Sequence, residues 1–138
     1  MIIANLAGKL GNYCRENPIG RALAKASYYV ENDDQFEQNP SLSFIKGKKP
    51  LIREGAAPFM PDLAVEVQSP DQSDRLMSDK AAYYLANGSR MVWLVYPTKR
   101  IVEALTPDDR ALLREEDTLS GGDVLPGFTL AVRDIFAE

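Results

Sequence analysis

Two carboxylates and a lysine are spaced so that they could act on one substrate. Glu66 lies within an otherwise aliphatic run, and Asp62 opens that run. Side chains alternate between the faces of a strand, so residues 62, 64, 66 and 68 share one face. Lys80 falls on the flank of an apolar helical stripe. Carboxylate oxygens can hold Mg²⁺, which lowers the pKa of a bound water, and a lysine can orient that water. The set is typical of phosphodiester cleavage.

Each of these three residues also has a simpler explanation. Glu66 could lie on the wet face of a half-exposed antiparallel sheet. Lys80 could lay its stem over the edge of the core and keep its ammonium in water. Asp62 could be an ordinary polar residue at a strand start. Asp62 and Glu66 are four residues apart, about 13 Å along an extended strand, so they could not share one ion without a bend.

The composition narrows the chemistry further. The chain has 138 residues, no histidine and one cysteine, Cys14. The absence of histidine excludes Ser-His-Asp and Cys-His nucleophiles and His-ligated metals. A single cysteine forms no internal disulfide and favours a cytoplasmic setting. The longest apolar run, residues 91–96, is far below the ~18 residues of a membrane span, so we expect no membrane partner. The net charge of −4 means that nucleic acid would need a local basic patch.

The elements that position these residues follow from hydrophobic periodicity. Helices are predicted over residues 2–16 and 73–87, with a last helical turn within 132–136. Strands are predicted over residues 21–30, 42–45, 63–68, 91–96 and 101–105. The chain is long enough for one domain over residues 1–138. We therefore predict an α/β fold, a mixed sheet core flanked by helices in α-β-β-β-α-β order, with an added hairpin strand. Trp93 and the pair Tyr83-Tyr84 are interpreted as core filling.

Several motifs together point to a known family. They are E-V-x-S-P at residues 66–70, Lys80 followed by Tyr84 and Gly88, V-W-L-V-x-P at 92–97, and L-P-G-F at 125–128. This combination covers nearly the whole chain and resembles the Uma-two family of restriction-type endonucleases, a branch of the PD-(D/E)XK nuclease superfamily. The predicted order of elements matches the restriction-endonuclease-like core of that superfamily. The resemblance implies a Mg²⁺-dependent or Mn²⁺-dependent endonuclease that hydrolyses phosphodiesters of DNA.

The resemblance also assigns roles to single residues. It implies that Glu66 is the metal-binding acid of the E-x-K half-motif. Gln68 stands where that half-motif has lysine, and Lys80 on the following helix takes the place of that lysine. The Pro-Asp half-motif aligns with Pro40-Ser41, so Ser41 stands at a metal-ligand position without the carboxylate. Losing that charge weakens a divalent-cation site. The alternative is a catalytically inactive nuclease-fold module that binds nucleic acid or protein.

Three further expectations concern surfaces and chain ends. A basic cluster between the second and third predicted strands could follow a phosphate backbone, or it could be a solvated lysine-rich loop; its members are Lys46, Lys48, Lys49 and Arg53. Family members usually carry a segment before the opening helix, so the resemblance implies a shortened N-terminus. Members of the superfamily often dimerise, which leaves room for a homodimer here.

Overall fold

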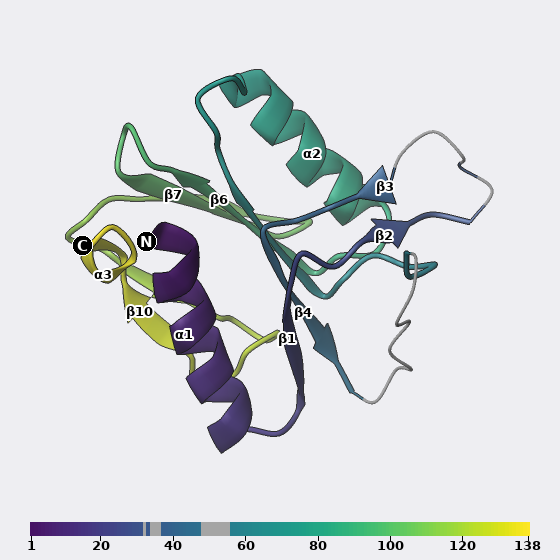
Figure 1. The fold of residues 1–138 in the computed structure, drawn as a ribbon, viewed down its shortest axis with the longest axis horizontal. Coiled ribbons are helices and arrows are strands. Elements are labelled where there is room, and N and C mark those ends of the chain that lie inside the picture. The colour runs from purple at the N-terminus through teal and green to yellow at the C-terminus, as the bar shows by residue number, and fades with distance from the viewer. Residues whose placement is uncertain (32, 34–36, 48–55) are drawn as a thin grey trace.

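The computed structural model describes residues 1–31, 33, 37–47 and 56–138 (Figure 1). Its elements in chain order are α1 (Ile2–Glu16), β1 (Gly20–Ala24), β2 (Tyr28–Tyr29), β3 (Glu37–Gln38), β4 (Leu42–Lys46), β5 (Leu63–Val67), α2 (Asp74–Ala86), β6 (Met91–Tyr96), β7 (Ile101–Leu105), β8 (Arg110–Leu113), β9 (Thr118–Ser120), β10 (Thr129–Ala131) and α3 (Val132–Ile135). Within these described segments, no helix combines the length and the apolar character that crossing a membrane requires.

A mixed six-stranded sheet forms the centre of the fold. Its strand order is β1-β4-β5-β6-β7-β8. All neighbouring pairs are antiparallel except β5 and β6, which run parallel with Leu63 opposite Met91 and Glu66 opposite Leu94. A parallel pair needs a crossover connection, and α2 supplies it. Helix α2 therefore follows directly from the strand that carries Glu66.

The two faces of the sheet are covered by different helices, which lie on opposite sides of it in Figure 1. On one face, Leu6 and Leu10 of α1 pack with Val65 and Trp93. On the other face, Met77, Ala81 and Tyr84 of α2 pack with sheet residues that include Ala64 and Leu94. Every residue of β6 is buried, as its continuous apolar sequence predicts. The fold is the mixed α/β architecture expected from the sequence.

Most predicted elements are found, with one correction. The predicted opening helix over 2–16 matches α1, and α2, β5, β6 and β7 lie within a few residues of their predicted bounds. The single strand predicted over 21–30 is wrong. Lys25 has a positive φ of 57°, which ends β1, and the chain then leaves the main sheet so that β2 pairs with β3. Alternation of small and β-favouring residues continues across this break, so periodicity alone does not reveal it.

Candidate functional site

Glu66 lies in the buried interior beneath α2. It is the fourth residue of β5, and only 5% of its surface is exposed. Its side chain lies on the face that α2 covers, so the interpretation of Glu66 as a residue on a wet sheet face is wrong. A charged group that is removed from water is costly unless other groups pair with it. The structure provides two such groups, both from α2.

Lys80 and Tyr84 each contact one oxygen of the Glu66 carboxylate. The Lys80 Nζ lies 3.7 Å from Oε1. The Tyr84 hydroxyl donates a hydrogen bond of 2.8 Å to Oε2. Residues four apart on a helix lie on the same face, so one helical face delivers both contacts. The carboxylate is therefore held at both oxygens.

The protonation preferences of this group follow from its burial. Burial raises the pKa of the Glu66 carboxyl, while the hydrogen bond from Tyr84 and the charge of Lys80 act in the opposite direction. Burial and the nearby Glu66 charge together raise the pKa of Tyr84 far above its ordinary value. The Tyr84 hydroxyl therefore stays protonated and keeps its role as a donor.

The local sequence explains why α2 sits in this position. Ser73 caps its start by accepting a hydrogen bond from Leu76 N at 3.0 Å. Met77, Ala81 and Tyr84 recur at helical spacing and are buried against the sheet. Lys80 lies at the edge of this stripe, with 27% of its side chain exposed. Its ammonium can therefore contact Glu66 and solvent at once.

Ser41 reaches the same end of β5 from the neighbouring strand. It immediately precedes β4, and the register that pairs Leu42 with Val65, extended by one residue, sets Ser41 opposite Glu66. The Ser41 Oγ accepts a hydrogen bond of 3.3 Å from Val67 N. The structure thus brings Ser41 beside the Glu66 strand, with a lone pair of its hydroxyl directed to the backbone.

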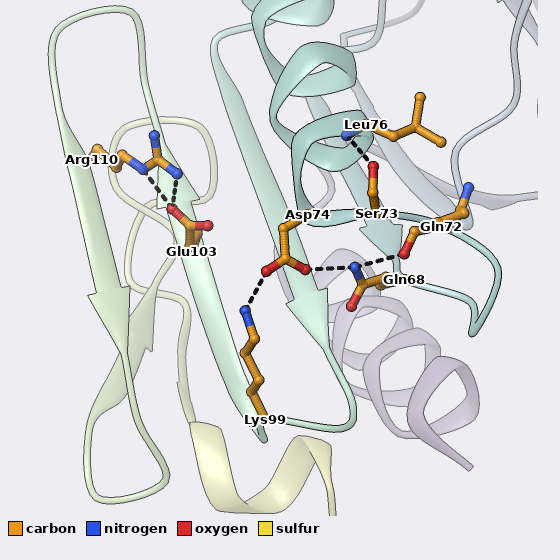
Figure 2. Close-up of polar contacts among 8 residues, drawn as sticks. All are labelled: Gln68, Gln72, Ser73, Asp74, Leu76, Lys99, Glu103 and Arg110. Atoms are coloured by element: carbon orange, nitrogen blue, oxygen red, sulfur yellow. Dashed lines mark hydrogen bonds and ion pairs between the residues drawn. The ribbon is translucent and has the colours of Figure 1, made fainter.

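Gln68 is close in sequence to Glu66 but bonds elsewhere, as Figure 2 shows. Its Nε2 donates to Gln72 O at 3.0 Å and to Asp74 Oδ1 at 2.8 Å. The other oxygen of Asp74 accepts from Lys99 in the turn between β6 and β7. Lys99 and Gln68 hold the pKa of Asp74 below its ordinary value. Gln68 therefore belongs to a surface network that ties the first turn of α2 to the sheet.

Asp62 lies at the opposite end of β5. Its Oδ2 accepts a hydrogen bond of 2.7 Å from Lys46 N, and its carbonyl oxygen accepts from Arg90 N and Met91 N. These contacts hold the end of β4 and the start of β6 against the start of β5. The structure does not bring Asp62 together with Glu66.

The expected basic cluster is described only at Lys46. This residue is exposed at the last position of β4, the end of that strand farther from Ser41. Lys48, Lys49 and Arg53 lie outside the described residues. Lys46 is about 17 Å along the strand from Ser41, which separates it from the Glu66 group.

Both the sequence and the fold of the chain are similar to those of known proteins. A family model named Uma2 and described as "Putative restriction endonuclease" matches residues 1–133. The chain belongs to the Uma2 family. A crystal structure from Anabaena variabilis, described as that of a "putative nuclease belonging to DUF820", matches with a TM-score of 0.82. The two chains are 20% identical over 98% of this chain and 78% of the other, a likeness that shows a shared fold. No curated protein matches the chain.

The donors that the described part of this Uma2 chain places around Glu66 do not fit a Mg²⁺ site. Mg²⁺ prefers oxygen ligands, with carboxylates supplying the negative charge. Among the residues whose positions are described, Glu66 supplies the carboxylate at the site, and both of its oxygens already have partners. Ser41 offers a neutral oxygen that already accepts from Val67 N. Within the part of the chain that the structure describes, no three residues of the types His, Cys, Asp and Glu group closely enough to hold a metal ion.

The contact that sequence reasoning missed in this Uma2 chain is the one made by Tyr84. The sequence interprets this residue as core filling, and it is indeed fully buried, but its hydroxyl also bonds Glu66. The spacing of four residues between Lys80 and Tyr84 was the available signal. A helix that directs Lys80 toward a carboxylate directs the residue one turn later toward the same place.

Proposed function

We propose that this Uma2 chain binds the phosphodiester backbone of nucleic acid, with DNA the expected form, at the Glu66–Lys80 pair, and that it hydrolyses the bond weakly or not at all. The observation that carries the proposal is the combination of a Lys80–Glu66 ion pair of 3.7 Å with a serine on the strand beside it. The family and the nuclease fold support nucleic acid as the ligand.

Two hydrogen-bond donors at this site favour binding of an anion. The partly exposed Lys80 ammonium has three N–H groups, of which Glu66 occupies one side. The Ser41 hydroxyl accepts from Val67 N, and its own hydrogen is not used in that bond. Lys80 and Ser41 therefore each keep a hydrogen to donate to a phosphate group, and charge-assisted bonds of this kind are the strong ones.

Weak hydrolysis follows from the same residues. Attack on a phosphodiester needs an activated water and a cation that offsets the charge that develops. Ser41 provides no negative charge to recruit that cation, and the charge of Glu66 is already matched by Lys80. The site therefore supports contact with a phosphate better than it supports cleavage.

The second candidate is an active Mg²⁺-dependent or Mn²⁺-dependent endonuclease. The observation in its favour is that Glu66 and Lys80, which are fourteen residues apart, meet at one point as a nuclease site requires. This candidate requires a cation to bind despite the partners of Glu66. It predicts cleavage by the wild-type chain, which is directly measurable.

The test combines a plasmid-nicking assay with a binding assay. Nicking is measured with Mg²⁺ or Mn²⁺, and binding to a labelled DNA duplex is measured in EDTA at several salt concentrations. We expect the wild type to bind with an affinity that falls with salt, and to show no nicking. Lys80→Ala should weaken binding by roughly tenfold, the factor for one charged hydrogen bond. Lys9→Ala is the matched control, because Lys9 is exposed on α1 on the other side of the sheet.

Each half of the proposal has its own contrary result. Nicking by the wild type that Lys80→Ala abolishes would establish the second candidate. Binding that is absent, or that Lys80→Ala and Lys9→Ala weaken equally, would overturn the assignment of the phosphate contact to Lys80. Ser41→Asp is included in the nicking assay, and we expect it to gain activity if the missing carboxylate is the reason for weak hydrolysis.

A further inference from the structure

Glu66 and its acidic neighbour Asp74 are each paired with a lysine in the part of the chain that is described. Glu66 carries one negative charge and Lys80 carries one positive charge at 3.7 Å. Asp74, the nearby acid that Gln68 contacts, pairs with Lys99. Ser41 and Gln68 are neutral. The described residues of the site therefore form two closed ion pairs and leave no net negative charge for a divalent cation.

The contacts of the Glu66 carboxylate also oppose the binding of a cation. The Tyr84 hydroxyl holds Oε2 at 2.8 Å, and the Lys80 ammonium faces Oε1. Both groups come from one helical face that is buried against the sheet through Met77 and Ala81. A cation that approached either oxygen would have to displace a partner fixed by the packing of α2.

We infer that the Lys80 ammonium, and not a divalent cation, is the resident counter-charge of Glu66, so that the described residues form no divalent-cation site at this position. This inference deepens the proposed function, since it rests on the same site and states what replaces the metal there. Tyr84 is the positioning residue that holds the carboxylate in reach of Lys80. A nucleic-acid phosphate then meets the ammonium directly.

An unusual consequence is that removing the lysine should create a cation site. In Lys80→Met the Glu66 charge loses its partner, and a cation becomes the available replacement. Mn²⁺ is the probe, and its binding is measured by electron paramagnetic resonance and by titration calorimetry without nucleic acid. We expect wild type and Glu66→Gln to bind Mn²⁺ equally weakly. We expect Lys80→Met to bind it more tightly by roughly 10- to 100-fold, the range over which groups around a metal change its affinity.

Two control variants separate this effect from a general change in charge. Lys99→Met removes the same charge and the same side chain from the Asp74 ion pair, which is exposed, and it should leave Mn²⁺ affinity close to that of the wild type. The double variant Glu66→Gln with Lys80→Met should lose the gain. Circular dichroism confirms that each variant is folded, and Lys80→Gln replaces Lys80→Met if the latter is not.

Two results would overturn the inference. The first is wild-type binding of Mn²⁺ that Glu66→Gln abolishes, which is measured on proteins that keep Lys80 and needs no lysine variant. The second is equal Mn²⁺ affinity in the wild type and in a folded Lys80 variant. Failure of the proposed function is distinct, because nucleic-acid binding is measured separately in EDTA and Mn²⁺ binding is measured without nucleic acid.

Discussion

The Tyr84 hydroxyl donates a hydrogen bond to Oε2 of Glu66. A residue of the crossover helix α2 therefore supplies a partner to a carboxylate on the strand before it. Both residues are buried, at 0% and 5% exposure. The bond therefore lies where solvent cannot replace it. Removing it should affect both the stability of the fold and the geometry of the site.

Tyr84→Phe removes this bond without changing the shape of the core. We expect the free energy of unfolding to fall by about 1.5–3 kcal/mol, the range for a hydrogen bond to a charged group. The measurement is urea denaturation at neutral pH. Tyr13→Phe is the matched control, because the Tyr13 hydroxyl donates to the neutral carbonyl of Pro126 at 2.6 Å. Its loss should cost about 0.5–1.5 kcal/mol. If Tyr84→Phe lowers the free energy of unfolding no more than Tyr13→Phe does, the contact with Glu66 does not contribute the stability expected of a bond to a charged group.

Glu66→Gln should change how stability depends on pH. Burial raises the pKa of the Glu66 carboxyl in the folded state, so the folded chain binds this proton more tightly than the unfolded chain. The contribution of Glu66 to stability is then fully present below its unfolded pKa of about 4.3 and is lost as the pH rises through the raised folded value.

Glutamine does not titrate, so the variant should lack this loss. We expect the free energy of unfolding of Glu66→Gln minus that of the wild type to increase from about pH 4, where the unfolded carboxyl begins to ionise, toward neutral pH. Denaturation at a series of pH values gives this difference, in which the titration of other groups cancels. A difference that decreases over the same range would mean that Lys80 and Tyr84 outweigh burial.

Ser41→Asp should make the stability of the chain depend on Mg²⁺. The new carboxylate stands opposite Glu66, so the variant should be less stable than the wild type in EDTA. Binding of Mg²⁺ to the folded state should restore stability, by about 2.7 kcal/mol when the free ion is about 100 times its Kd. Thermal unfolding with EDTA and with millimolar Mg²⁺ measures the effect. Asn39→Asp, an exposed position two residues earlier, adds the same charge and should show no Mg²⁺ response.

Two glycine substitutions should act in opposite directions. Gly8 lies on the exposed side of α1, where an added Cβ would meet nothing within 4 Å. Gly8→Ala should therefore stabilise the chain by about 0.5–1 kcal/mol. At Gly20 an added Cβ would lie 2.3 Å from Ile45 O and 2.5 Å from the Phe44 ring. Gly20→Ala should destabilise by about 1–3 kcal/mol. Denaturation midpoints that shift in the same direction for both would contradict the close approach of β1 to β4.

The sequence predicts the sheet and helices well where periodicity determines them. The spacing of Leu6, Leu10 and Tyr13 predicts α1, and the unbroken apolar run at 91–96 predicts the doubly covered strand β6. The break at Lys25 was not predictable from spacing, since a positive φ at a lysine leaves no pattern in neighbouring residues. The division of residues 21–30 into β1 and β2 depends on tertiary pairing with β4 and β3.

The candidate site is predictable in part, for a related reason. The sequence predicts that Glu66 lies on a strand and Lys80 on the helix that follows it. The structure brings the two side chains together at 3.7 Å. The contact between Gln68 and Asp74 could not be predicted from the sequence. Asp74 lies at the start of α2, and the distance of that start from Gln68 depends on the loop at residues 69–73. The role of Tyr84 depends on which way α2 faces, which local sequence leaves open.

The bond between Gln68 and Asp74 supports the rotational position of α2, which is determined chiefly by the burial of Met77, Ala81 and Tyr84 against the sheet. A helix turns about 100° per residue, so a modest rotation about its axis carries all of its side chains past their partners. Asp74 is held at the first turn by Gln68 on one side and Lys99 on the other. Lys80 and Tyr84 follow on the same rigid rod, within its next three turns. A contact at the molecular surface thus acts together with the buried face of α2 to orient two side chains toward a carboxylate that solvent barely reaches.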